Sequence, residues 1–347
     1  MSGLIRVLVV DDSAFARKTI KQVLSRSPFI EVVGIAGDGE EALEKVAELH
    51  PDVITLDLVM PGLDGIGFLT KQMTSHPLPV VVVSTSSGHE DLVLKALEAG
   101  AVDFVHKPST LATETLFEMG EELIEKVKDA GSIRLKRIDP ASLVKAPALP
   151  SGHATGTKRV DAIVIGISTG GPQGLRHLIP QFAGDFPIPI AVVLHIPVGY
   201  TEMFAIKLDE LSALKVIEAK EGDLLQAGMV LIAPAGKHLT FRRNIDQSVV
   251  AHLDHRPSDT LHRPSVDILF ESAAEIYRDR ALGIVMTGMG SDGRRGASCI
   301  KKQGGLVYTE AEETCVVYGM PATVVEAGLS DRSIRLDGLA EAIMEVA

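Results

Sequence analysis

The chain of 347 residues is long enough for about two domains at roughly 150 residues each. Its formal net charge of −12, with 46% hydrophobic and 23% charged residues, disfavours general binding to nucleic acids or to anionic membranes. No apolar run approaches the roughly 20 residues that a membrane span needs, and the first residues lack the basic start of a secretory signal, so we expect a cytoplasmic protein without direct membrane insertion.

The N-terminal part alternates short apolar runs with stretches of helical periodicity. The apolar runs lie at residues 6–10, 31–36, 53–57, 80–84 and 103–107. Helical stretches span residues 40–49 and 91–100, and the second ends at Gly100, a residue that favours helix C-termini. Strands that alternate with helices form parallel sheets covered by helices on both faces. We therefore predict a doubly wound α/β domain over residues 1–124.

Polar side chains follow the predicted strands of this domain, at the sheet edge where such folds bind ligands. They are Asp11 and Asp12 after the first run, Asp57 at the third, Ser84 at the fourth and Lys107 at the fifth. Each aspartate alone could equally be a helix cap or a solvated loop residue, but capping does not explain the whole set. Converging carboxylates repel one another unless a cation lies among them, and hard oxygen ligands favour Mg²⁺. A lysine and a hydroxyl beside them could hold a phosphoryl group.

This set resembles the response-regulator receiver family over about residues 4–122. The matching motifs are VDDS, LDLVMPGLDG, VVVSTSS and DFVHKP. The resemblance implies a flavodoxin-like (βα)5 fold in which a histidine kinase phosphorylates Asp57. It implies that Mg²⁺ is held by Asp11 or Asp12, by Asp57 and by the main-chain carbonyl of Val59. It also implies that a conformational switch involves Ser84, Phe104 and Lys107.

The segment of residues 125–157 differs from the sequence on either side. It loses the hydrophobic periodicity and contains Pro140, Pro147 and Pro150 among small residues. That composition predicts a linker, although its first part could continue the preceding helix.

The C-terminal part, residues 158–347, again shows strand-like apolar runs. They lie at residues 160–166, 188–195, 229–234, 281–288 and 304–310. Residues 238–254 have the pattern of an antiparallel hairpin. We predict a second doubly wound, parallel-sheet α/β domain that carries this hairpin.

Residues 163–174 read IVIGISTGGPQG, in which Ser168 follows an apolar run and stands among glycines. The stretch fits the G-x-S-x-G pattern, which places a nucleophilic serine on a strained turn between a strand and a helix. A glycine-rich loop that binds phosphate at a helix N-terminus is the alternative. The pattern alone does not decide between them.

A nucleophilic serine needs a base, and the base needs an acid to orient it. His195 ends one apolar run, and Asp292 follows another. A lone buried histidine is more often structural, and an aspartate in a glycine-rich loop is more often a turn residue. Serine, histidine and aspartate at three strand ends together favour a catalytic triad. Their order along the chain differs from the serine, aspartate, histidine order of ordinary α/β-hydrolases.

Several segments of this part are similar to the CheB family of chemotaxis methylesterases. They are IGISTGGPQGL, LHIPVGYTEMFAIKL, IAPAGKHLTF, HRPSVDILFESAA, VMTGMGSDGRRGA and TCVVYGMPATVVEAG. The resemblance implies that Ser168 is the nucleophile, His195 the general base and Asp292 the acid that orients the imidazole. It also implies that the main-chain N–H of Met289 stabilises the oxyanion and that Thr169 lines the site.

The two resemblances together cover nearly the whole chain. They imply demethylation of glutamate methyl esters on methyl-accepting chemotaxis receptors, with release of methanol, and deamidation of receptor glutamines. They also imply that the chemotaxis histidine kinase CheA is the phosphodonor and that the esterase reaction needs no cofactor. The tether between the domains suggests the hypothesis that the receiver covers the catalytic edge until Asp57 is phosphorylated.

Two other classes of function stay open from the sequence. A receiver-controlled serine esterase could act on a small molecule or on another protein ester, and a non-catalytic binding protein would not need Ser168. The histidines of HLDHRPSDTLHRPS could suggest a metal cluster, but we expect them to line a substrate cleft or to cap a helix. These residues are His252, His255 and His262.

Overall fold

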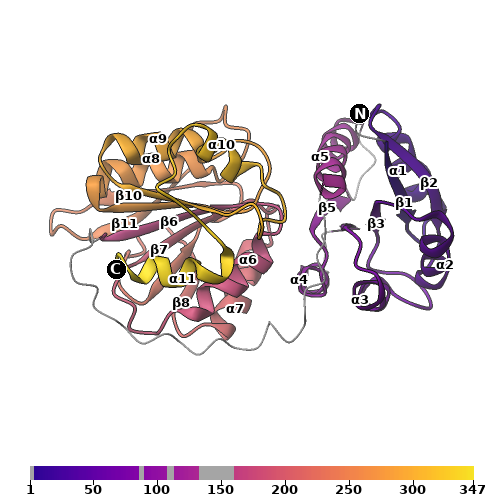
Figure 1. Ribbon diagram of the computed structural model, residues 1–347, viewed down its shortest axis with the longest axis horizontal. Helices are drawn as coiled ribbons and strands as arrows, with labels where there is room; N and C mark the ends of the chain where they lie inside the picture. Colours follow the sequence, from indigo (N-terminus) through magenta and orange to yellow (C-terminus); the bar gives the residue numbers. More distant parts are fainter. Residues whose placement is uncertain (1–3, 86–89, 108–112, 133–159) are drawn as a thin grey trace. The chain divides into compact units, whose positions relative to one another are not determined.

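The computed structural model of the chain describes residues 4–85, 90–107, 113–132 and 160–347. It divides the chain into two compact units, Met1–Ile138 and Asp139–Ala347, each with its own parallel sheet (Figure 1). Within the described ranges, no helix is both long and apolar enough to cross a bilayer.

The N-terminal unit has the predicted flavodoxin-like fold. Its parallel strands are β1 (Ile5–Val10), β2 (Ile30–Ala36), β3 (Val53–Leu56), β4 (Val80–Thr85) and β5 (Asp103–Lys107). They pair in the order β2-β1-β3-β4-β5. The helices are α1 (Ala14–Leu24), α2 (Gly39–Leu49), α3 (Gly65–Ser75), α4 (Glu90–Glu98) and α5 (Thr113–Ser132). This strand order brings the carboxyl ends of β1 and β3 side by side, with β4 next to β3.

Polar side chains at the helix starts fix where several helices of this unit begin. Asp38 accepts a hydrogen bond from the Glu41 N–H at 2.8 Å, and Asp64 accepts one from the Gly67 N–H at 2.7 Å. Each such cap stabilises its helix by about 1 kcal/mol. The caps hold the loops after the strands, where the acidic side chains lie.

The last helix of this unit extends beyond the predicted domain boundary. We expected the linker to begin at residue 125, but α5 continues to Ser132. Val127 and Ala130 are fully buried, and Lys126 forms an ion pair with Asp103 of β5 at 2.8 Å. Because these apolar side chains pack into the core, the segment is helical despite its polar composition. The remainder of the predicted linker, residues 133–157, lies outside the described residues.

The C-terminal unit contains a larger sheet in which every pairing is parallel. Its strands are β6 (Ala162–Ile167), β7 (Ile190–Leu194), β8 (Lys215–Glu218), β9 (Met229–Ile232), β12 (Ala281–Val285), β13 (Leu306–Glu310) and β14 (Arg332–Ile334). They pair in the order β14-β13-β12-β6-β7-β9-β8. Figure 1 shows α8 (Val266–Tyr277), α9 (Arg294–Lys302) and α10 (Met320–Glu326) over one face of this sheet. The other face carries α6 (Gly171–Leu178), α7 (Thr201–Leu211) and α11 (Leu336–Met344).

The strand order of this sheet reverses direction between β6 and β12. From β6 the chain runs outward through β7 to β8 and β9, and it then returns to β12 on the other side of β6. In open α/β sheets, ligands bind outside the carboxyl ends of the strands at such a reversal. The loops after β6, β7 and β12 therefore meet where a site is expected.

The predicted hairpin forms a separate two-stranded antiparallel sheet of β10 (His238–Arg243) and β11 (Val249–Asp254). It packs on α8: the Phe241 N–H donates to the Ser272 hydroxyl at 2.7 Å, and the Phe241 ring meets Tyr277 edge to face. This packing places His238, the first residue of the hairpin, near the start of α8.

Candidate functional site

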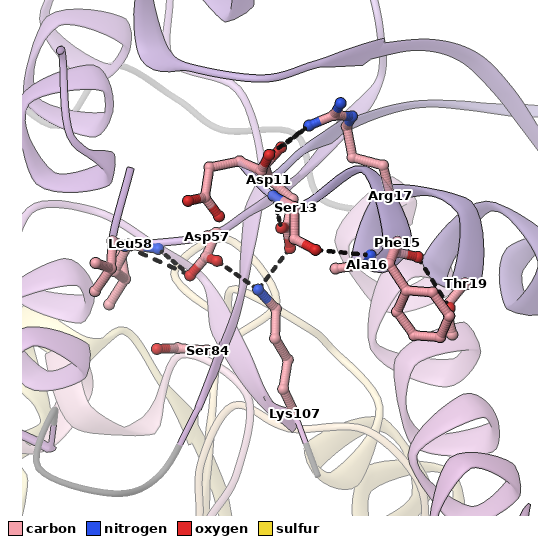
Figure 2. Close-up of polar contacts among 12 residues, drawn as sticks. Asp11, Ser13, Phe15, Ala16, Arg17, Thr19, Asp57, Leu58, Ser84 and Lys107 are labelled. Atoms are coloured by element: carbon pink, nitrogen blue, oxygen red, sulfur yellow. Dashed lines mark hydrogen bonds and ion pairs between the residues drawn. The ribbon is translucent and has the colours of Figure 1, made fainter. Parts of the chain in front are cut away.

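The acidic side chains of the N-terminal unit converge at the predicted sheet edge. Asp11, Asp12 and Asp57 each offer a carboxylate oxygen, and these oxygens lie within 4.8 Å of one another. The Lys107 ammonium lies between two of them, at 2.5 Å from Asp11 and 2.5 Å from Asp57 (Figure 2). Burial raises the pKa of Asp11 even though Lys107 opposes the shift. The buried Asp11 carboxylate, which pairs with Lys107 and accepts from the Ser13 N–H, offers the oxygen ligands that a divalent cation prefers.

The other predicted residues of this unit lie close in the chain or in the sheet to the acidic cluster. The Val59 N–H is 3.5 Å from an oxygen of Asp57. Ser84 is the second-last residue of β4, which pairs with β3, and its buried hydroxyl forms no hydrogen bond within the described residues. The Phe104 ring is buried, with the Lys126 ammonium 5.4 Å from the ring centre. No motif of the sequence pointed to Lys126, because it lies in the segment that was predicted to be a linker.

Replacing Lys107 with methionine is expected to destabilise the N-terminal unit when Mg²⁺ is absent. The variant leaves buried carboxylates without their cation, which costs about 3 kcal/mol in the free energy of unfolding. Mg²⁺ should bind the variant and recover more stability there than in the wild type. Denaturant unfolding with EDTA and with excess Mg²⁺ measures this.

Lys95→Met is the matched control, since the Lys95–Asp91 pair is exposed and should contribute little. No gain in stability from Mg²⁺ in Lys107→Met would show that the cluster does not take up the cation.

In the C-terminal unit, main-chain hydrogen bonds join the loops that carry the predicted triad. The Ser168 N–H donates to the Thr287 carbonyl at 3.0 Å, and the His195 N–H donates to the Ile167 carbonyl at 3.1 Å. Gly288 packs directly on Ser168, because a Cβ atom at Gly288 would lie 2.7 Å from the Cβ of Ser168. The loops after β6, β7 and β12 are therefore held in contact at the sheet edge.

His195 and Asp292 form a hydrogen-bonded pair. His195 Nε2 lies 3.0 Å from Asp292 Oδ2, and both side chains are largely buried. Because Asp292 is ionised, Nε2 carries the proton and Nδ1 keeps its lone pair. Nδ1 is buried and has no hydrogen-bond partner within the described residues. Nδ1 is therefore the ring atom that is available as a base.

The Ser168 hydroxyl is not hydrogen-bonded to His195 in this structure, and catalytic hydrogen bonds are often long without substrate. Ser168 itself also differs from the predicted strained turn. Ser168 does not have a positive φ. Gly170, which precedes α6, has a φ of 78°. The strain of the turn is thus carried by a glycine, which adopts this conformation at little cost.

Asp292 also caps the start of α8. Its Oδ1 accepts hydrogen bonds from the Ser265 hydroxyl and the Asp267 N–H, each at 2.9 Å, and its Oδ2 accepts one from the Val266 N–H at 2.8 Å. Burial alone would raise the pKa of Asp292, but the bonds from His195, Asp267 and Val266 outweigh it and lower the pKa to about 2. Asp292 therefore stays ionised and keeps the imidazole in one tautomer.

Sequence reasoning missed the residues that hold Asp292. The Ser265 N–H donates to His238 Nδ1 at 3.2 Å, and His238 Nε2 lies 3.1 Å from the Pro257 carbonyl. The only sequence signal was Ser265 itself, a favourable N-cap residue before an apolar helix. His238 could not have been chosen, because its contact depends on how the hairpin packs on α8.

The residues predicted to surround Ser168 differ in their exposure and in their hydrogen bonds. Met289 is 36% exposed, and its N–H donates no hydrogen bond within the described residues, so it is available for an oxyanion. The Ser168 N–H is already bonded to Thr287 and cannot serve. Thr169 is buried, and its carbonyl accepts a hydrogen bond from the Thr287 hydroxyl at 3.0 Å.

The three histidines that the sequence singled out near the hairpin contact different parts of the structure. The His262 ring stacks on the His195 ring, with 4.2 Å between the ring centres. His252 pairs with Glu221 at 2.9 Å, and His255 lies 3.1 Å from the Gly236 carbonyl. Only His262 thus contacts the predicted catalytic residues, as expected of a residue that lines the cleft.

Replacing Ser265 with alanine is expected to lower kcat about tenfold on a small ester. The variant removes one hydrogen bond to the ionised Asp292, which contributes about 1.5 kcal/mol, and frees the carboxylate to turn away from His195. Steady-state kinetics measure the effect. Ser272→Ala serves as the control, because Ser272 bonds to the hairpin and not to Asp292. Equal kcat values for the two variants would contradict the role of Ser265.

Both parts of the chain are similar to known proteins. A CheB methylesterase family model matches residues 163–343, and a response regulator receiver domain model matches residues 7–119. A Myxococcus xanthus protein named "Protein-glutamate methylesterase/protein-glutamine glutaminase 5" is 51% identical, with 96% of each chain covered. A Methanosarcina acetivorans protein named "Protein-glutamate methylesterase/protein-glutamine glutaminase 2" is 42% identical, with 99% of each chain covered.

A solved structure adds to these relatives. The CheB methylesterase catalytic domain of Thermotoga maritima is 40% identical with a TM-score of 0.53, covering 54% of this chain and 99% of that one. The chain therefore belongs to the CheB methylesterase family, and its N-terminal part is a response regulator receiver domain.

Proposed function

We propose that this chain demethylates glutamate methyl esters on methyl-accepting chemotaxis receptors, releases methanol, and deamidates receptor glutamines. The observation that carries the proposal is the His195–Asp292 pair, whose free Nδ1 lies at the same sheet edge as Ser168. The names of the relatives, protein-glutamate methylesterase and protein-glutamine glutaminase, point to the same two reactions.

In this mechanism the Ser168 hydroxyl oxygen attacks the ester carbonyl while His195 Nδ1 takes the hydroxyl proton. The Met289 N–H stabilises the oxyanion, and one such donor contributes about 3 kcal/mol to transition-state binding. The protonated imidazole then returns the proton to the methoxide as methanol leaves. Asp292 stabilises the imidazolium during this step, since it stays ionised.

The resulting acyl group on Ser168 is removed by water. His195 takes a proton from the attacking water and returns it to the Ser168 oxygen, which leaves a glutamic acid side chain on the receptor that loses its proton to solvent and becomes the carboxylate. A glutamine side chain follows the same route, with ammonia as the first leaving group. Both substrates therefore give the same charged product.

Receiver domains accept phosphoryl groups in a Mg²⁺-dependent reaction. Here Asp57 is the phosphoryl acceptor and the histidine kinase CheA the donor, with Asp11 or Asp12, Asp57 and the Val59 carbonyl as the cation ligands. When bound, Mg²⁺ neutralises negative charge around the transferred group. The buried Ser84 hydroxyl, Lys107 and Phe104 then respond to the added charge of about −1.5 to −2, which activates the esterase.

The experiment compares two substrates for the wild-type chain and for Asp57→Asn. Methanol release from methylated receptor membranes should exceed the hydrolysis of p-nitrophenyl acetate in kcat/KM. A phosphodonor should raise methanol release in the wild type and leave Asp57→Asn unchanged. Efficient hydrolysis of the small ester without any methanol from receptors would instead identify a small-molecule esterase.

A further inference from the structure

The end of β13 contains a buried carboxyl group that the mechanism above does not use. The Glu310 side chain is 0% exposed, and its Oε2 accepts a hydrogen bond from the Thr287 N–H at 3.0 Å. The polar groups that act on it are the Thr287 N–H, Thr314 and Cys315, and no described cation is among them. Burial of an ionised carboxylate without a cation is very costly. Burial accordingly raises the pKa of Glu310 above its usual range.

The partner of Glu310 connects the nucleophile to the loop that carries Met289. The Thr287 carbonyl accepts from the Ser168 N–H at 3.0 Å, and the Thr287 hydroxyl lies 3.0 Å from the Thr169 carbonyl. The same hydroxyl accepts from the Val317 N–H at 2.9 Å. Thr287 therefore fixes both sides of the oxyanion site, and its own N–H is held by Glu310.

We propose that Glu310, through its hydrogen bond with the Thr287 N–H, is a positioning residue that sets the distance between Ser168 and the Met289 N–H. The inference rests on the proposed function of Ser168 and Met289. Glu310 touches neither the substrate nor the reacting atoms. It acts by holding the Thr287 N–H, so that the loop after β12 cannot move away from the end of β6.

The hydrogen bond to the Thr287 N–H distinguishes two substitutions of Glu310. Glu310→Gln keeps the volume and an oxygen that accepts from the Thr287 N–H, so kcat should stay near the wild-type value. Glu310→Met keeps a similar volume but has no strong acceptor, and the buried N–H is left unpaired. Because small displacements of catalytic groups are costly, kcat should fall about 10- to 100-fold in Glu310→Met, with KM little changed.

The test measures kcat and KM of the full chain on p-nitrophenyl acetate, together with thermal unfolding. Thr309→Val is the matched control: Thr309 is the preceding residue of β13, is 0% exposed, and bonds to Ser330. This control should keep kcat. A loss of kcat in Glu310→Met with rescue in Glu310→Gln supports the inference.

Two results would overturn the inference. One is an unchanged kcat in Glu310→Met. The other is a fall of kcat of about 10- to 100-fold in a folded Glu310→Gln variant. If Glu310→Met does not fold, the Gln variant alone decides by the same criterion. Ser168→Ala is measured in parallel. Activity that survives in Ser168→Ala refutes the proposed function itself, independently of what Glu310 does.

Discussion

Ser168→Ala is expected to lower kcat/KM on p-nitrophenyl acetate by about 10⁴-fold or more, to the residual rate that oxyanion binding alone supports. The variant removes the proposed nucleophilic oxygen and leaves the His195–Asp292 pair intact. Stopped assays of ester hydrolysis measure the loss. Thermal unfolding should differ little from the wild type, because the Ser168 hydroxyl makes no hydrogen bond within the described structure.

The matched control for this prediction is Ser248→Ala, at an exposed turn of the hairpin between β10 and β11. It should keep the wild-type rate. A residual activity in Ser168→Ala within about tenfold of the wild type would mean that another group is the nucleophile or that water attacks directly.

Asp292→Asn is expected to lower kcat by about 10⁴-fold, because the variant neutralises the acid that fixes the imidazole tautomer. An asparagine can turn its NH₂ group toward His195, and Nε2 must then accept, which moves the proton to Nδ1. The base would be lost although the imidazole stays in place. A pH–rate profile and kcat for the purified variant measure this loss.

The same variant should be less stable at neutral pH by about 2 kcal/mol. The pKa of Asp292 in the folded protein, about 2, lies below its value in the unfolded chain. Its contribution to stability is therefore present above the unfolded pKa of about 4 and is lost as the pH falls toward 2. The difference in unfolding free energy between wild type and variant should shrink over that range.

Asp267→Asn separates the structural from the catalytic effect of Asp292. Asp267 accepts from the Gly293 and Gly296 N–H groups at the start of α9, at 2.9 and 2.8 Å, and does not contact His195. Its loss should lower stability with a far smaller effect on kcat. An equal fall of kcat in both variants would contradict the assigned role of Asp292.

Much of the fold was predictable because both domains bury nearly continuous apolar strands. Strands such as β3 and β7 are buried at every residue and appear in the sequence as short apolar runs. The outer strands β8 and β14 of the larger sheet were missed. Their sequences are KVIE and RSI, and most of their residues are not buried, so they lack the apolar pattern of central strands.

The site was predictable where residues end strands, and unpredictable where they meet through packing. Asp11 and Asp57 follow the neighbouring strands β1 and β3, and Lys107 ends β5 at the same edge, so sheet topology brings them together. His238 and Glu310 lie within predicted strands or hairpins, and only the tertiary contacts with Ser265 and Thr287 give them a role. The roles of Ser168, His195 and Asp292 in the reaction stay predictions, to be decided by measurement.

The most direct test of the account measures two reactions on the same full-length protein. Wild type, Ser168→Ala and Asp57→Asn are incubated with methylated receptor membranes, Mg²⁺ and a labelled phosphodonor, and both methanol release and phosphorylation are measured. We predict that Ser168→Ala is phosphorylated like the wild type but releases no methanol, and that Asp57→Asn is not phosphorylated and is not activated by the donor. Methanol release by Ser168→Ala at the wild-type rate would contradict the account.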